Sequence, residues 1–448
     1  MEEQKKNFCD AIMETLNDFL VKLDGMREYV FSAIDEQTKN IISYLNKLNK
    51  EKGILGKTLK YLEQGDVFIA QIQLDCDNYE NLNKKINGTL HSSKLIINGE
   101  IVSLVSVFDY YLYGLLKKTC QYLGDNFNNK DTSIKYSEIK NCTTTEEIKN
   151  YYIEKYLEEL FKNSSHHFLF EEIKNRFNIT EIRNYSHYKD LLFITELRNI
   201  IVHNDSKISI MFKNKMDELN IDYNQYKMIN KEGVVDINPQ QIISIFEILV
   251  FSSIYIALLF AIHFRKKEKK EIEEFLGEIN SLTLDCIKKG YAKISIELFD
   301  CLLKISKSSS DKFIYTVNKC VALKYLNKNE EMKKTLDDLD WSNCEERFKF
   351  AKNCLLNNYS EAVEFLRKQE KKEEWKYNLQ TWPLCKELVR SDIFIEEYPK
   401  IFGETFENKI KEWKNTKKDI KKVENSIKKA IKKVNKEKNN ESSDKKEN

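Results

Sequence analysis

The residues with the clearest chemical potential lie together in the stretch 191–205. Its apolar residues recur at helical spacing, which predicts an amphipathic helix ending near residue 204, with apolar positions 191, 194, 197 and 201. On such a helix Glu196, Asn199 and His203 share one face, and Arg198 lies on the adjoining stripe. A guanidinium, an amide, a carboxylate and an imidazole therefore occur together, and these groups can bind a phosphate and move a proton.

A further carboxylate, Asp109, lies in the helix predicted for residues 102–123. A single carboxylate on such a helix is usually solvated, although it can also orient a cation supplied by a neighbouring helix. His166 and His167 follow later in a loop-like Ser-Ser-His-His run. Adjacent histidines point in different directions on most backbones, so we expect no metal site there. The sequence contains no P-loop, no nucleophile elbow and no acidic cluster suited to Mg²⁺, so we expect neither a metal nor a cofactor.

The composition predicts an all-α protein. Only 3 prolines and 12 glycines occur among 448 residues, and long runs are rich in Leu, Ile, Lys and Glu. Proline and glycine interrupt helices, so their scarcity favours helices throughout. The length suggests two or three units, and the formal net charge of +2 does not by itself require a nucleic-acid partner.

The cysteines and the N-terminus favour a cytoplasmic location. The 10 cysteines show no Cys-x-x-Cys spacing, a pattern that indicates reduced, mostly buried thiols rather than disulfides or structural zinc. Residues 1–10 are polar and carry no apolar segment, so we expect no secretory signal.

The N-terminal region predicts one or two long helices. From residue 10 to about 62, apolar residues recur in steps averaging near 3.5, the spacing of a narrow helix–helix seam. The partner is another helix of the same chain or a second copy. Between 65 and 100 the pattern becomes irregular: 67–74 resembles a short strand, and Asn98-Gly99 a tight turn or the loop before the next helix.

A long apolar helix is predicted for residues 240–264. Its composition, with Arg265-Lys266-Lys267 behind it, meets the crude test for a membrane span. Glu247 weakens that interpretation, and a helix buried on all sides has the same composition. We therefore expect a core helix and no membrane partner.

The C-terminal part predicts helix pairs. The segments 290–299, 327–336 and 358–366 look alike, and their matching positions 294, 332 and 362 lie 38 and 30 residues apart. The mean of 34 is the period of tetratricopeptide repeats, which stack into solenoids that bind proteins. A plain helical bundle is the alternative.

Residues 408–448 carry 15 lysines against 7 acidic side chains, which indicates either a tail that holds RNA loosely or a solvated terminus.

The segment from Arg198 to His203 resembles the motif of the HEPN superfamily, an Arg and a His separated by four to six residues, often with a polar residue directly after the Arg. Here the spacing is four and the polar residue is Asn199. The surroundings resemble the family too: an upstream helix containing SVFDYYL (106–112), the motif helix and a long apolar closing helix follow in the expected order. The resemblance covers about 95–265.

The resemblance implies a metal-independent endoribonuclease of the toxin, abortive-infection or antiviral-defence type. Arg198 would bind the scissile phosphate and His203 would act as general base or general acid. Asn199 would orient the imidazole ring or donate to the phosphate, with Glu196 and Asp109 as weaker supports. One Arg and one His make half a site, so the resemblance implies a homodimer acting on RNA. A trigger or inhibitor protein would bind the repeats.

The alternative is a non-catalytic adaptor that binds RNA, a nucleotide or a protein. The predicted regions are a long-helix extension (1–94), a HEPN-like bundle (95–266), repeats (267–400) and a basic tail (401–448).

Overall fold

The computed structural model describes residues 8–52, 80–127, 133–163 and 165–403. The regular structure within these ranges is helical, apart from two isolated β-bridges, so the protein is all-α as predicted. The strand predicted at 67–74 and the tail beyond 403 lie outside the described residues. No disulfide links the cysteines of the described ranges.

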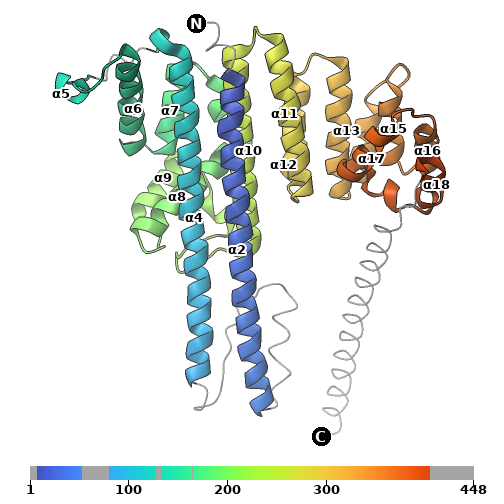
Figure 1. Ribbon diagram of the computed structural model, residues 1–448. Helices are drawn as coiled ribbons and strands as arrows, with labels where there is room; N and C mark the ends of the chain where they lie inside the picture. The colour runs from blue at the N-terminus through green and yellow to red at the C-terminus, as the bar shows by residue number, and fades with distance from the viewer. Residues whose placement is uncertain (1–7, 53–79, 128–132, 164, 404–448) are drawn as a thin grey trace. The chain divides into compact units, whose positions relative to one another are not determined.

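Two long helices, α2 (Phe8–Lys52) and α4 (Glu80–Leu123), lie side by side (Figure 1). They run antiparallel: Phe8 stacks on Tyr122 with ring centroids 4.3 Å apart, and Phe19 contacts Phe108 further along. The 3.5-residue seam on α2 is buried there, including Ile12, Leu16, Phe19, Leu23 and Val30. The partner of the N-terminal seam is thus a helix of the same chain.

The helix α4 begins earlier than the sequence suggested. Residues 80–101 belong to it, so Asn98-Gly99 is neither a turn nor a loop but helix interior. Its buried side carries Leu104, Phe108, Tyr111 and Leu115. Packing against α2 supplies the free energy that local propensity does not, because helices in proteins are stabilised mainly by an apolar face. The helix consequently runs through the predicted division at 94/95.

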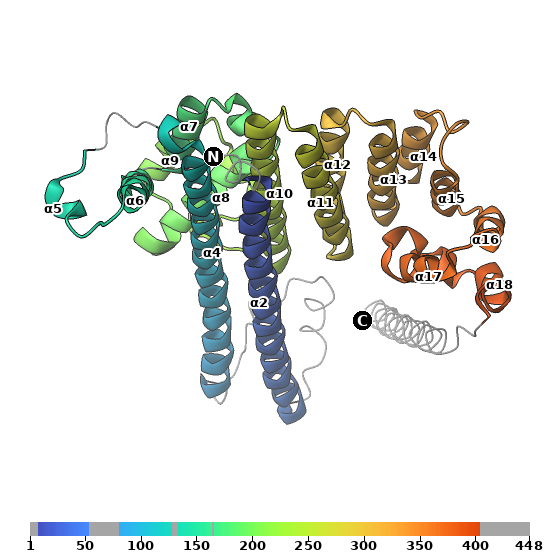
Figure 2. The same cartoon turned by 45° about the horizontal axis from the view of Figure 1, so that its top comes forward.

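The apolar helix α10 (Pro239–Arg265) fills the core beside α2, α4 and α8 (Tyr188–His203), as Figure 2 also shows. A capping box fixes its start: the Gln241 backbone N–H donates to Asn238 Oδ1 at 2.9 Å, and the Asn238 backbone N–H donates to Gln241 Oε1 at 2.8 Å. Pro239 lies in the first turn, where its missing N–H is not needed. The Tyr111 hydroxyl donates to the Ser253 carbonyl at 2.7 Å and ties α4 to it.

Two described helices are long and apolar enough to cross a membrane, namely Lys85–Asn126 and Pro239–Arg265. The apolar window of the second is 78% buried inside the protein. Burial among α2, α4 and α8 therefore accounts for its composition.

Between α4 and α8 come α6 (Thr145–Asn163), α7 (His166–Phe177) and the short 3-10 helix η3 (Thr180–Arg183). The expectation of a loop at His166 and His167 is wrong, because Ser165 caps α7 by accepting from the Phe168 N–H and both histidines lie in the first helical turn. The segment 206–238, between α8 and α10, contains a further helix, α9 (Ile210–Glu218), whose Phe212 and Met216 are buried.

The described chain divides into two compact units, Met1–Cys286 and Ile287–Asn448, with α11 (Lys269–Lys288) crossing the division. The compact division therefore falls later than the predicted 266/267. In the second unit α12 (Ala292–Ile305) packs on α13 (Ser309–Tyr325), α13 on α14 (Asn329–Asp337), and α15 (Glu346–Leu355) on both α13 and α16 (Tyr359–Arg367). The three matching positions, Ile294, Met332 and Ala362, are all buried.

Candidate active site

The helix α8 carries the motif along one edge of the first unit. Its apolar residues Leu191, Ile194 and Leu197 are buried, and the helix packs against α4 and α10. Because this face faces the core, the polar residues of the last turns are turned away from it. Arg198 and Asn199 are half-buried, whereas His203 is exposed.

Three polar side chains of α8 are connected. The Arg198 Nη1 atom donates to Asn199 Oδ1 at 3.2 Å, and Asn199 Nδ2 donates to Glu196 Oε2 at 3.3 Å. Five residues of helix would separate Arg198 from His203 by about 140° around the axis. The hydrogen bond to Asn199 holds the guanidinium toward the helix face that carries Glu196 and His203. The Asn199 amide therefore connects Arg198 to the side of the helix on which the imidazole lies.

Sequence reasoning missed Lys215, which comes from α9. Its Nζ lies 2.5 Å from Glu196 Oε1, and the Glu196 side chain is only 9% exposed. Glu196 therefore neutralises Lys215 and accepts a hydrogen bond from Asn199. No local signal pointed to this pair, because its members lie on two helices joined by a turn.

The guanidinium of Arg198 keeps unused donors. Within the described ranges its only hydrogen bond is to Asn199, and its buried Nε atom has no partner. A guanidinium has five N–H donors in a plane and can hold a phosphate through two parallel bonds. Arg198 thus retains the capacity to bind an anion.

The turn behind His203 is fixed by contacts with other elements. Asp205 and Ser206 both adopt left-handed backbone angles, with φ of 49° and 62°, which are costly for residues other than glycine. Asn98 of α4 donates to Ser206 Oγ at 3.0 Å, and the Val235 N–H donates to Ser206 O at 2.8 Å. His203 itself is exposed and makes no hydrogen bond or ion pair to the described residues.

Asp109 lies elsewhere. Its Oδ1 is 2.5 Å from His166 Nε2 of α7. Asn98 of α4 contacts Ser206, so it lies beside the end of α8 that carries His203. Asp109 is eleven residues further along α4, or about 16 Å away. The structure therefore places Asp109 at the opposite end of the motif helix, beside a histidine that the sequence had not connected with it.

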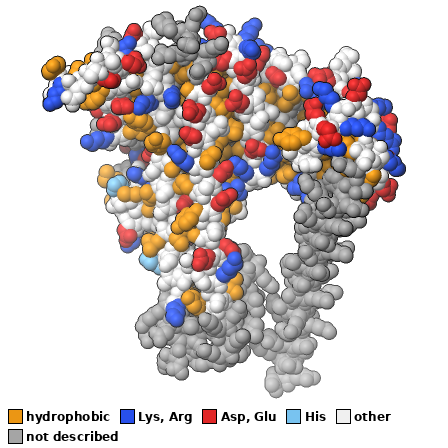
Figure 3. Space-filling model, viewed as in Figure 1, with side chains coloured by type: hydrophobic (Ala, Val, Ile, Leu, Met, Phe, Trp, Pro, Cys, Tyr) orange, Lys and Arg blue, Asp and Glu red, His pale blue; other side chains and the backbone are white. Residues whose placement is uncertain are grey.

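On the face shown in Figure 3, acidic and basic side chains are mixed over the first unit. That face therefore offers no broad basic field to a polyanion.

In the described part of the chain, no group of three or more His, Cys, Asp and Glu residues is placed to hold a metal ion. The arrangement that the site does offer is an anion-binding guanidinium, an orienting amide and an open imidazole on one helix. Comparison with protein-family models, with curated proteins and with solved structures found no match for this chain.

Proposed function

We propose that the chain is a metal-independent endoribonuclease of the HEPN type. The observation that carries this proposal is the Arg198–Asn199–Glu196 chain of hydrogen bonds beside the exposed His203. It provides phosphate binding and proton transfer on adjoining turns of one helix. The sequence resemblance supports the same assignment.

The chemistry is an attack of the RNA 2′-oxygen on the adjacent phosphorus. A base removes the 2′-hydroxyl proton, the bond from phosphorus to the 5′-oxygen breaks, and an acid protonates that leaving oxygen, which gives a 2′,3′-cyclic phosphate and a 5′-hydroxyl. Arg198 binds the non-bridging oxygens, whose negative charge grows in the transition state. His203 takes one of the two proton-transfer roles.

The second proton-transfer group comes from a second copy, so the active species is a homodimer. The exposed apolar side chains near His203 support this. Val202 is 46% exposed beside it, and Ile210 and Met211 at the start of α9 are 77% and 82% exposed. Leu95, one turn before the Asn98 that holds the turn after His203, is 59% exposed. Exposed apolar side chains at the end of α8, at the start of α9 and on α4 are suited to an interface between copies.

The second unit supplies the regulatory surface in this proposal. Its consecutive helix pairs, with the matched positions buried, suit a repeat array that binds a trigger or inhibitor protein. The role that follows from the resemblance is a growth-arresting or antiviral nuclease.

The test is RNA cleavage by the purified full-length protein in EDTA, with fragment ends examined for 2′,3′-cyclic phosphate. We expect His203→Ala and Arg198→Ala each to lower the rate by about 10² to 10⁴-fold, the usual contribution of a positioned acid or base and of an electrostatic contact. His263→Ala and Arg347→Ala serve as matched controls, because they change an exposed histidine at the C-terminal end of α10 and an exposed arginine of the second unit.

Two results would contradict the proposal. If both motif variants cleave RNA at the wild-type rate while circular dichroism shows all proteins folded, Arg198 and His203 are not catalytic. If the wild type leaves RNA intact and instead forms a stable protein complex through the second unit, the adaptor alternative is correct.

A further inference from the structure

A cavity of about 330 Å³ lies at the other end of α8 from His203. Its walls come from four elements: α7 supplies His167 and Lys174, η3 supplies Arg183, α8 supplies Tyr188 and Lys189, and α9 supplies Glu218. This volume is at the small end of the range for small-molecule sites. Tyr188 stands ten residues before Arg198, about 15 Å along the helix axis, so the cavity is separate from the candidate active site.

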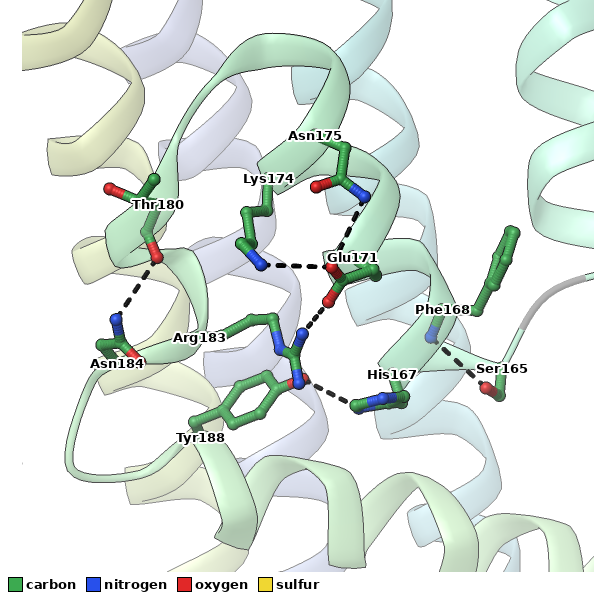
Figure 4. Close-up of polar contacts among 10 residues, drawn as sticks. All are labelled: Ser165, His167, Phe168, Glu171, Lys174, Asn175, Thr180, Arg183, Asn184 and Tyr188. Atoms are coloured by element: carbon green, nitrogen blue, oxygen red, sulfur yellow. Dashed lines mark hydrogen bonds and ion pairs between the residues drawn. The ribbon is translucent and has the colours of Figure 1, made fainter.

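The cavity contains more positive than negative charge. Lys174 Nζ lies 3.2 Å from Glu171 Oε1, and Arg183 pairs with the same carboxylate, so one anion serves two cations (Figure 4). Lys189 Nζ donates to a neutral acceptor, the Asn220 carbonyl, at 2.7 Å. Glu218 is the one carboxylate among the residues found to line the cavity. Among the lining residues three cations therefore face one carboxylate, while Glu171 and Glu181, which accepts from the lining Thr180 Oγ1 at 3.0 Å, lie close by.

The pKa of His167, in the cavity wall, responds to positive charge nearby. His167 Nδ1 lies 3.2 Å from the Tyr188 hydroxyl, and Figure 4 shows the two side chains meeting beside Arg183. The pKa of His167 is lowered, first by burial and then by the positive charges of Arg183 and Lys215. A neutral imidazole next to these cations can donate one hydrogen bond to a bound anion and can take up a proton when that anion binds.

We propose that this cavity binds the phosphate group of a small phosphomonoester of mononucleotide size. Arg183 and Lys174 contact the phosphate oxygens, which share these cations with Glu171, and Lys189 supplies the remaining positive charge at the rim. The walls are recessed, since Tyr188 is buried and His167 half-buried, which favours a small ligand over a long strand. This assignment holds whether or not Arg198 and His203 cleave RNA.

The experiment is calorimetric titration of the full-length protein with inorganic phosphate and with AMP, in EDTA. We expect both probes to bind, and Arg183→Gln and Lys174→Gln each to weaken binding by about tenfold or more, the loss expected for one charge-assisted hydrogen bond. Lys213→Gln, an exposed lysine of α9 outside the cavity, is the matched control and keeps wild-type affinity.

A second measurement locates the ligand and does not depend on Arg183, whose replacement also removes an ion pair of the fold. The proton NMR signals of His167, assigned by comparison with His167→Gln, are expected to shift on addition of phosphate. Its pKa should rise on binding, because a bound anion favours the imidazolium.

The proposal is overturned if neither probe binds at millimolar concentration. It is equally overturned if Lys213→Gln weakens binding as much as the cavity variants do, or if phosphate leaves the His167 signals unmoved. Should only a short RNA oligonucleotide bind, with affinity lost in Lys174→Gln, the anion is an RNA phosphodiester and the small-molecule assignment is wrong.

Discussion

At the scale of single residues, Asn199 gives the candidate site its geometry. An Arg and a His five residues apart point to different sides of a helix, and the amide between them joins the cation to the stripe that carries the imidazole. The spacing in the sequence was enough to predict that Glu196, Asn199 and His203 share a face. It could not predict Lys215, because that contact depends on where α9 folds back.

Another residue, Glu100 of α4, makes the stability of the protein depend on pH. Burial raises the pKa of this carboxyl from 4.5 to about 7, and its Oε1 has no hydrogen-bond partner among the described residues. The folded pKa of Glu100 is above the unfolded one. The carboxyl therefore does not lower the free energy of unfolding below pH 4.5, and stability is lost as the pH rises from 4.5 through 7.

We therefore expect the free energy of unfolding of Glu100→Gln, relative to that of the wild type, to increase by on the order of 2 kcal/mol as the pH rises from 4 to 8. Urea unfolding at both pH values measures this difference. Glu14→Gln, which changes an exposed carboxylate on α2, is the control and should show no such trend. A pH-independent difference for Glu100→Gln would show that the carboxyl is not held in an apolar environment.

At the scale of elements, the helices that carry strong local signals were predictable and those that depend on packing were not. The start of α10 lies at Pro239, one residue from the prediction, because the Asn238 cap, the proline and the apolar run all indicate the same position. By contrast, residues 80–101 contain Asn, Gly and Ser and resemble an irregular segment. Contact with α2 makes them helical, and no single-sequence pattern reveals that contact.

The capping box of α10 gives a test at this scale. Replacing Asn238 with Ala removes the side-chain acceptor for the Gln241 N–H, and we expect a loss of about 1 kcal/mol in the free energy of unfolding. Asn238→Asp keeps an acceptor oxygen and should retain most of the stability. Chemical denaturation of the three proteins compares them directly, and equal losses in both variants would mean that the cap contributes nothing.

At the scale of the whole molecule, the proposed activity depends on assembly. The chain is nearly neutral, with a formal charge of +2, so electrostatic repulsion between copies is small. The exposed Val202, Ile210 and Met211 are then free to meet the same surface of a second copy.

We expect Met211→Glu to convert the proposed dimer into a monomer, because it places a charge in an apolar contact. RNA cleavage should fall with the dimer fraction and recover in part at high protein concentration. Light scattering after gel filtration measures the mass. The control is Val21→Glu, an equally non-conservative change at an exposed position of α2 (70% exposed), and it should remain dimeric. A dimer that persists in Met211→Glu would show that the interface lies elsewhere.

The pairing of α2 with α4 also bears on how the motif can be inherited or transferred. A fragment spanning only 95–266 would begin inside a continuous helix and would lack α2, which covers Phe108 and Tyr111. Those aromatic rings would then meet water, and the fragment would aggregate rather than fold. The segment 95–266 is therefore not a portable module, and gene fusion or recombination could move it intact only together with α2.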